Sequence, residues 1–285
     1  MNTFHYGAGA ENVLQMFERE TEGNYLFLGK SGLKKADFAR EQIRRNLQVE
    51  KLAFCPDYYE VSEEGSVIGV DGITDISSFT KTLPSCGKMK YCLIPYAQRL
   101  TPAASNALLK MIEESKNVVF VFTASRKLLN TVMSRVRVIR CEPLTKGEFF
   151  ELYPDADETI RRFVCGRSGA YEKIMADEKL KAAAERLVNG IDDLKNSRDF
   201  LEIFSQVKEK DPNSFFELES EFVSLSLEYL SEQIMLHMCG EQKTLPYSVG
   251  ECWTLMGELN GAMFQLERGK YGKNDFFALV RKLVG

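Results

Sequence analysis

The sequence predicts an α/β fold in which a parallel-sheet domain is followed by helical domains. Apolar runs at residues 91–94, 118–123 and 136–141 are typical of strands, and helix-start signals lie between the first two runs. Strand, helix, strand, short helix and strand then follow one another within about fifty residues, the scale of βαβ construction. After Pro143 the strand pattern stops, and apolar residues recur at helical spacing.

The length of 285 residues predicts more than one domain. We place a nucleotide-binding-type α/β domain at residues 1–143, a small helical domain at 144–178 and a C-terminal helical bundle at 179–285. The bundle prediction depends on residues 214–238, where two apolar stripes run along one long helix and indicate burial on two sides. Further helices are expected at residues 179–195, 197–210, 252–266 and 275–284.

Composition makes several classes of function improbable. The net charge is −4, so a protein coated in nucleic acid is not indicated, although a local basic stripe stays open. The 7 Cys include no C-x-x-C pair, and His5 and His237 are the only histidines, so we expect reduced thiols and no metal site. No apolar run approaches the roughly 18 residues of a membrane span, and the start lacks a signal-peptide pattern. We expect a cytoplasmic protein without a membrane partner.

The stretch NYLFLGKSGLKKADF has the order strand, glycine-containing loop and helix, which is the setting of a phosphate loop. A working loop has the pattern G-x-x-x-x-G-K-[ST], in which backbone amides and lysine bind phosphate and the hydroxyl holds magnesium. Counted from Gly29, Lys34 replaces the second glycine, Lys35 keeps the lysine place and Ala36 replaces the hydroxyl. Gly29, Gly32 and Lys35 therefore form either a degenerate phosphate loop or an ordinary strand-to-helix turn. This stretch alone leaves both interpretations open.

The strand at residues 91–94 ends without the carboxylates of a magnesium-dependent nucleotide site. In an open parallel sheet, ligands bind beyond the carboxyl ends of the strands. There the chain reads PYAQ, and the first carboxylate after the strand is Glu113. The next helix begins at Thr101-Pro102, a good N-cap and first-turn pair. Metal-assisted phosphoryl transfer thus lacks its acidic groups here, and we expect the chain to use no cofactor of its own.

The block from Leu93 to Arg135 resembles the clamp-loader branch of the AAA+ ATPases. It contains AQRLTPAASNALLKMIEES, then FVFTAS, then LLNTVMSRV, in order and at close to family spacing. The resemblance covers residues 25–143 well and the helical remainder more loosely. There it implies a small helical lid at residues 144–178 and, at 179–285, a collar that assembles with sister subunits, with a plain helical domain as the alternative. Within that branch, the chain resembles the delta-prime subunits of the bacterial DNA polymerase III clamp loader, which keep the fold and commonly lack a working ATP site.

The resemblance implies a role for Ser134 and Arg135. In the family, a Ser-Arg-Cys motif supplies an arginine finger to ATP bound by the neighbouring subunit. Ser134 and Arg135 match this motif, and Val136 replaces the cysteine. A planar guanidinium can contact the charge that develops on a transferred phosphoryl group. The ordinary alternative is an arginine in a surface ion pair.

Two family features are not matched. The four-Cys zinc module that usually follows the phosphate-loop helix is absent, because only Cys55 lies in that interval. The basic residue of the family's second sensor falls on Ala170, with Arg167 nearby.

The resemblance implies a non-catalytic subunit that helps to load the sliding clamp onto primed DNA in replication. The implied partners are gamma/tau-type and delta-type clamp-loader subunits, with the clamp and primer-template DNA reached through the complex. Two other functions stay open, an autonomous ATPase with an atypical site and a DNA-binding adaptor. The adaptor would use the basic residues Lys30, Lys34, Lys35, Arg40, Arg44 and Arg45. Charge runs on helices are usually solvated faces, which weakens this last interpretation.

Aromatic residues near the C-terminus could belong to the core or to an interface. We favour the core for Trp253, Phe264, Phe276 and Phe277.

Overall fold

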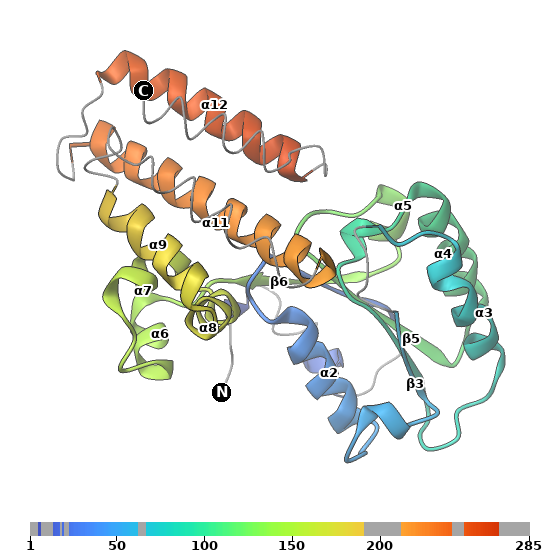
Figure 1. Cartoon of the computed structure of the whole chain (residues 1–285). Coiled ribbons are helices and arrows are strands. Elements are labelled where there is room, and N and C mark those ends of the chain that lie inside the picture. Colours follow the sequence, from blue (N-terminus) through green and yellow to red (C-terminus); the bar gives the residue numbers. More distant parts are fainter. Residues whose placement is uncertain are drawn as a thin grey trace. The chain divides into compact units, whose positions relative to one another are not determined.

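The computed structural model describes residues 5–6, 14–17, 19, 23–61, 67–190, 212–240 and 248–267. The chain divides into two compact units, Met1–Leu144 and Thr145–Gly285. The first unit is α/β, and the described part of the second is helical (Figure 1). The predicted α/β class is confirmed, whereas a further division of the second unit at residue 178 stays a prediction. The expected helices at 197–210 and 275–284 lie outside the described residues.

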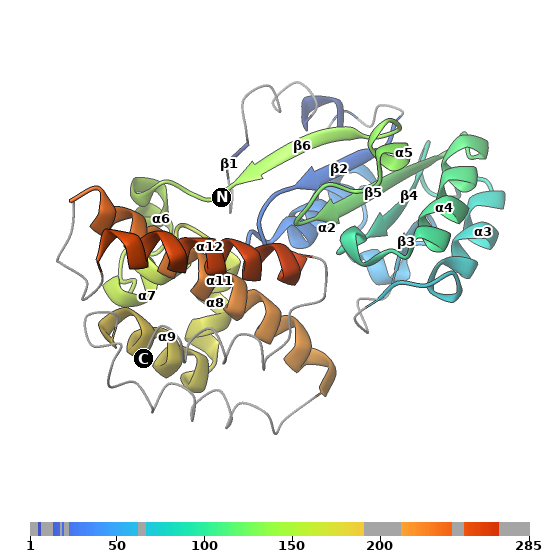
Figure 2. The ribbon, with the colours of Figure 1, turned by 90° about the horizontal axis from the view of Figure 1, so that it is seen from above.

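A six-stranded sheet in the order β1-β6-β2-β5-β4-β3 forms the centre of the first unit. Its strands are β1 (His5–Tyr6), β2 (Tyr25–Leu28), β3 (Tyr58–Glu60), β4 (Lys90–Ile94), β5 (Val118–Ala124) and β6 (Arg137–Glu142). β1 pairs antiparallel with β6, and the other pairs are parallel. Figure 2 shows β6, β2, β5 and β4 side by side. The apolar runs of the sequence predicted β2, β4, β5 and β6 and missed β1, which is too short to show a period.

Helices cover both faces of this sheet. α2 (Lys35–Asn46) lies on one face, and α3 (Thr74–Lys81) and α4 (Pro102–Glu114) lie on the other (Figure 1). Because successive strand side chains point to opposite faces, Tyr25 and Phe27 pack in the cluster of Ile43 on α2. Leu26 packs in the cluster of Leu108 on α4. Burial on both faces explains why these strands read as continuous apolar runs.

The start of α4 agrees with its sequence signals. The Thr101 hydroxyl accepts a hydrogen bond from the backbone N–H of Ala104 at 3.1 Å, and Pro102 occupies the first turn. This side-chain cap contributes about 1 kcal/mol to helix stability. Short elements complete the unit, namely the 3-10 turns η1 (Leu52–Phe54), η2 (Asp71–Ile73) and η3 (Ala97–Arg99) and the helix α5 (Asn130–Met133).

The second unit contains helices α6 (Lys146–Leu152), α7 (Glu158–Val164), α8 (Ser168–Ala176), α9 (Glu178–Gly190), α11 (Pro212–Met238) and α12 (Val249–Glu267). α11 is buried on two sides, as predicted. Phe222 and Tyr229 of one stripe and Val223 and Leu230 of the other are all at most 5% exposed. Phe163 of α7 packs on Phe222 with ring centroids 5.2 Å apart.

The core prediction for Trp253 and Phe264 was wrong. These side chains are 65% and 49% exposed. The buried stripe of α12 contains Cys252, Leu255 and Leu259 at helical spacing, and the two aromatic residues lie off this stripe. Residues 276–277 lie outside the described residues.

Candidate functional site

The sheet places the phosphate-loop position and the Ser134-Arg135 pair at opposite edges. In the parallel pair β2–β6, the first residue of β2 lies opposite Arg137 and the last lies opposite Arg140. The loop that starts at Gly29 follows the carboxyl end of β2, whereas Arg135 precedes the amino end of β6. The two ends of β2 are about 10 Å apart, at about 3.3 Å per residue. The chain's own Arg135 is therefore remote from the chain's own loop.

The glycines of the loop have structural roles. A Cβ atom on Gly29 would lie 2.2 Å from the carbonyl oxygen of Cys141 in β6, so the close approach of β2 to β6 requires glycine. Gly32 has a φ of +78°, which also favours glycine. Backbone geometry alone therefore explains both glycines, without a bound phosphate.

The two lysines of the loop adopt arrangements that differ from those of a phosphate loop. Lys34 is the N-cap residue of α2 and has a φ of 56°, a left-handed conformation that the family's glycine would adopt without strain. Lys35 is only 8% exposed, and its ammonium donates a hydrogen bond of 2.5 Å to the carbonyl oxygen of Lys30. The lysine that would bind phosphate in the family is thus bonded to the backbone of its own loop.

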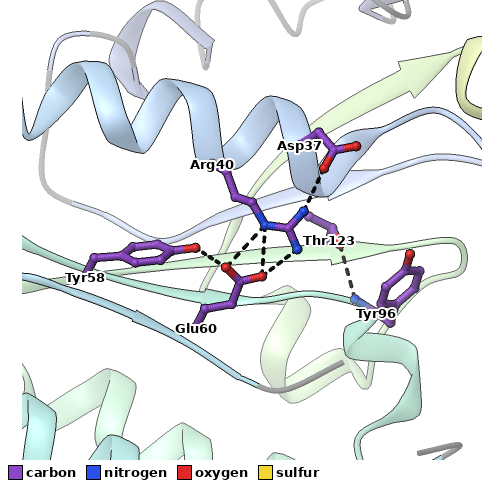
Figure 3. Close-up of polar contacts among 6 residues, drawn as sticks. All are labelled: Asp37, Arg40, Tyr58, Glu60, Tyr96 and Thr123. Atoms are coloured by element: carbon purple, nitrogen blue, oxygen red, sulfur yellow. Dashed lines mark hydrogen bonds and ion pairs between the residues drawn. The ribbon is translucent and has the colours of Figure 1, made fainter. Parts of the chain in front are cut away.

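The position after β4 is occupied by backbone and neutral polar groups. The backbone N–H of Tyr96 donates to the Thr123 hydroxyl at the end of β5, at 3.2 Å (Figure 3). The Gln98 side chain accepts a hydrogen bond from the backbone N–H of Ser125 at 3.2 Å. The guanidinium of Arg126 bonds the Gln98 carbonyl oxygen at 3.1 Å. These contacts join the two loops where a magnesium site would need carboxylates.

A carboxylate does lie between α2 and β3, but it is paired. Glu60 of β3 accepts hydrogen bonds from Arg40 of α2 at 3.0 Å from Nε and 2.6 Å from Nη2, and Arg40 Nη1 bonds Asp37 at 2.7 Å (Figure 3). The Tyr58 hydroxyl donates to the same Glu60 carboxylate. Burial and this hydrogen bond raise the pKa of Tyr58 above its usual value. Sequence reasoning missed this cluster because its members are distant in the chain.

The three arginines of α2 are paired with carboxylates. Arg44 Nε and Arg45 Nε each lie 2.8 Å from the carboxylate of Glu41. With Arg40 paired to Glu60, three of the six basic residues assigned to the DNA-binding alternative have carboxylate partners. This pairing reduces the positive charge that they present to DNA phosphates.

Glu41 gives a test of this pairing. The hydrogen bonds from Arg44 and Arg45 lower the pKa of its carboxyl from 4.5 to about 2. Because the folded pKa is below the unfolded one, the stabilisation is complete above pH 4.5 and is lost as the pH falls toward about 2. A carboxyl-carbon NMR titration should find this midpoint. In the Arg44→Gln/Arg45→Gln double variant the pKa should rise toward 4.5, and an unchanged midpoint there would contradict the assignment.

Arg135 follows α5 and lies on the surface of the first unit. Its Nε atom is 2.7 Å and its Nη2 atom 2.5 Å from Oε1 of Glu113, near the end of α4. Its Nη1 atom donates to the Thr131 carbonyl oxygen at 2.8 Å and to the Ser134 hydroxyl at 3.1 Å. The Arg135 side chain is 36% exposed. The structure therefore brings the two predicted residues Ser134 and Arg135 into direct contact.

Two residues that the sequence did not single out support this region. Glu113 binds the guanidinium of Arg135 from a distance of 22 residues along the chain. The Asn24 side chain donates to the Arg135 carbonyl oxygen at 3.4 Å and accepts from the backbone N–H of Phe120 at 3.0 Å. Asn24 thereby connects the starts of β2, β5 and β6. No sequence signal indicates contacts of such separation.

Arg167, close to the expected second-sensor position, is a buried residue of the second unit. It is 1% exposed and forms an ion pair with Glu228 of α11. Its Nε and Nη1 atoms have no hydrogen-bond partner within the described structure. Ala170 is buried inside α8. The basic residue nearest to the expected position thus contacts its own unit.

Among the described residues, no three or more His, Cys, Asp and Glu side chains are placed to hold a metal ion. The same part of the chain includes no helix with the length and apolar character needed to cross a membrane.

The first unit is similar in sequence to known proteins. Residues 11–145 match the family described as "DNA polymerase III, delta subunit". The chain is 41% identical over 87 residues to DNA polymerase III subunit delta' of Haemophilus influenzae, and 33% identical over 99 residues to that of Escherichia coli. Over this region, the chain is similar to delta-prime subunits of DNA polymerase III. The matched segments cover 29% and 33% of this chain, and 27% and 30% of the two relatives.

The fold of the chain also resembles a solved structure. A DNA polymerase III gamma subunit-related protein of Thermotoga maritima superposes with a TM-score of 0.55 and 21% identity, covering 96% of this chain and 98% of that one. At this identity the likeness shows the fold alone, which is the predicted parallel α/β domain followed by helices. The chain spans less than a third of the length of the curated relatives that it matches.

Proposed function

We propose that this chain is a non-catalytic subunit of the DNA polymerase III clamp-loader complex and supplies Arg135 to ATP bound by a neighbouring subunit. The observation that carries the proposal is the position of Arg135. It precedes the amino end of β6, at the edge of the sheet opposite to the chain's own phosphate-loop position. This position keeps Arg135 away from a nucleotide bound at Gly29, which supports a role at a nucleotide bound by another chain.

The loop and the position after β4 support the non-catalytic part of the proposal. Lys35 is bonded to the Lys30 carbonyl oxygen, and Ala36 offers no hydroxyl to magnesium. The contacts of Tyr96 with Thr123 occupy the place where carboxylates would act. Phosphoryl transfer depends on positioned cations and a bound metal, and these groups are missing from the motif positions.

The wider function follows from the delta-prime relatives. As part of a clamp loader, the chain helps to place the sliding clamp on primed DNA during replication in the cytoplasm. Its partners are gamma/tau-type ATPase and delta-type subunits, and it meets clamp and DNA within that assembly. In this assembly Ser134 orients Arg135 through the hydrogen bond between its hydroxyl and Nη1.

Two measurements distinguish the proposed function from that of an autonomous ATPase: ATP turnover by the isolated chain, and its binding to another clamp-loader subunit. We expect the purified full chain to show no magnesium-dependent ATP turnover, and native mass measurement to find it bound to the ATP-hydrolysing clamp-loader subunit of the same organism. Turnover by the isolated chain at a rate that survives Arg135→Ala would refute the proposal and favour the autonomous enzyme.

A further inference from the structure

The contacts of Arg135 within its own subunit limit the number of N–H donors that it can offer to a nucleotide. A guanidinium has five N–H donors. One from Nε, two from Nη1 and one from Nη2 are used by Glu113, Thr131 and Ser134, which makes four of the five. An arginine in this arrangement cannot also bind a phosphate with a full fork of donors.

The opposite charges of Glu113 and Arg135 also limit the action of Arg135 on a nucleotide. Both short contacts from Glu113 are charge-assisted, because a carboxylate faces a guanidinium at 2.5 and 2.7 Å. While they persist, the carboxylate offsets the positive charge that would stabilise a transferred phosphoryl group. Action on a neighbour's nucleotide therefore requires Arg135 to leave Glu113.

The electrostatics of α4 do not favour a carboxylate at the position of Glu113. Glu113 and Glu114 are at the C-terminal end of α4, where the helix dipole disfavours negative charge and where the last turn contains no basic residue. Glu114 lies at a long distance of 3.9 Å from Lys110. Glu113 is compensated by Arg135, which comes from another element. A local conflict resolved by one tertiary contact is a common feature of functional positions.

We infer that Glu113 is a positioning residue that holds the Arg135 guanidinium against its own subunit until the phosphates of a neighbour's ATP displace it. The inference rests on the proposed function of Arg135. The phosphate chain of ATP carries several negative charges, so it competes well with a single carboxylate that is itself 53% exposed. Such an exchange would couple docking of the nucleotide-bound neighbour to release of the arginine.

The holding contact can be measured in the isolated full chain. Glu113→Gln keeps the size of the side chain and an acceptor oxygen but removes its charge. Hydrogen exchange at Nε of Arg135, followed by ¹⁵N NMR, should become up to about fivefold faster, the range of an exposed ion pair. Glu114→Gln is the matched control, because it removes the same charge one residue away and should leave the exchange unchanged. Equal exchange in wild type and Glu113→Gln would overturn the inference.

The assembled complex tests the consequence for ATP hydrolysis. Glu113→Gln should raise kcat at the shared site by up to about fivefold without changing KM for ATP. The gain should vanish in the Glu113→Gln/Arg135→Ala double variant. An unchanged or lower kcat in Glu113→Gln, in a complex where Arg135→Ala still lowers turnover, would overturn the inference and leave the proposed function intact. If Arg135→Ala has no effect on turnover, the proposed function fails first, and the inference fails with it.

Discussion

Replacing Arg135 by alanine should slow ATP hydrolysis at the site that this chain completes by about a thousandfold or more, the range of arginines supplied in trans. The physical reason is that the contact of the guanidinium strengthens as charge develops on the transferred phosphoryl group in the transition state, so its loss lowers kcat more than affinity. Single-turnover measurement on the reconstituted complex would show one kinetic phase lost while phases from other subunits keep their rates.

Two further variants make this result specific. Arg135→Lys keeps the charge but loses the planar fork, so it should restore only part of the rate. Arg140→Ala removes an exposed arginine further along β6 and should leave hydrolysis unchanged. Arg135 is partly exposed, so its alanine variant should keep its fold, and surface ion pairs contribute about 0–1 kcal/mol to stability. Full hydrolysis by an intact Arg135→Ala complex would exclude the arginine finger.

Removing the charge of Glu228 should destabilise the second unit by about 3–5 kcal/mol. Glu228→Gln would leave the guanidinium of Arg167 buried without its carboxylate, and this arginine is 1% exposed. A buried unpaired charge costs more than the pair itself contributes. The measurement is the free energy of unfolding from denaturant titration of the full chain, with a probe in the second unit.

The double variant Glu228→Gln/Arg167→Met should recover most of this loss, because methionine removes the uncompensated charge and the donors Nε and Nη1 that lack partners in the described structure. Glu232→Gln, an exposed acid one turn further along α11, serves as the control and should change stability little. A Glu228→Gln protein as stable as wild type would show that the ion pair is unimportant. If Arg167→Met instead abolished ATP response of the complex at normal stability, Arg167 would have a role beyond its own unit.

Some secondary-structure elements could be predicted from the sequence, and others could not. The strands β2, β4 and β5 were predictable because burial on both faces makes them continuous apolar runs. α4 was predictable from its cap at Thr101-Pro102. β1 was not, because two residues cannot display a period. Trp253 was misplaced since amphipathic burial depends on which stripe of α12 meets its neighbours.

The candidate site could likewise be predicted only in part. Residue type at fixed spacing identified Lys34 and Ala36 as departures from a phosphate loop, and the family resemblance singled out the Ser134-Arg135 pair. It could not reveal that Lys35 bonds the Lys30 carbonyl oxygen or that Glu113 binds Arg135, because these contacts depend on three-dimensional geometry.

By itself, the sequence determined the α/β class, the order of most strands along the chain and the missing groups of the nucleotide motifs. These properties follow from local periodicity and from residue chemistry at fixed spacing. Only the tertiary structure decided that Arg135 and the loop at Gly29 occupy opposite edges of the sheet, and that α4 delivers Glu113 to Arg135. Strand pairing sets these positions, and pairing between distant segments is fixed by packing of the whole domain rather than by any local pattern.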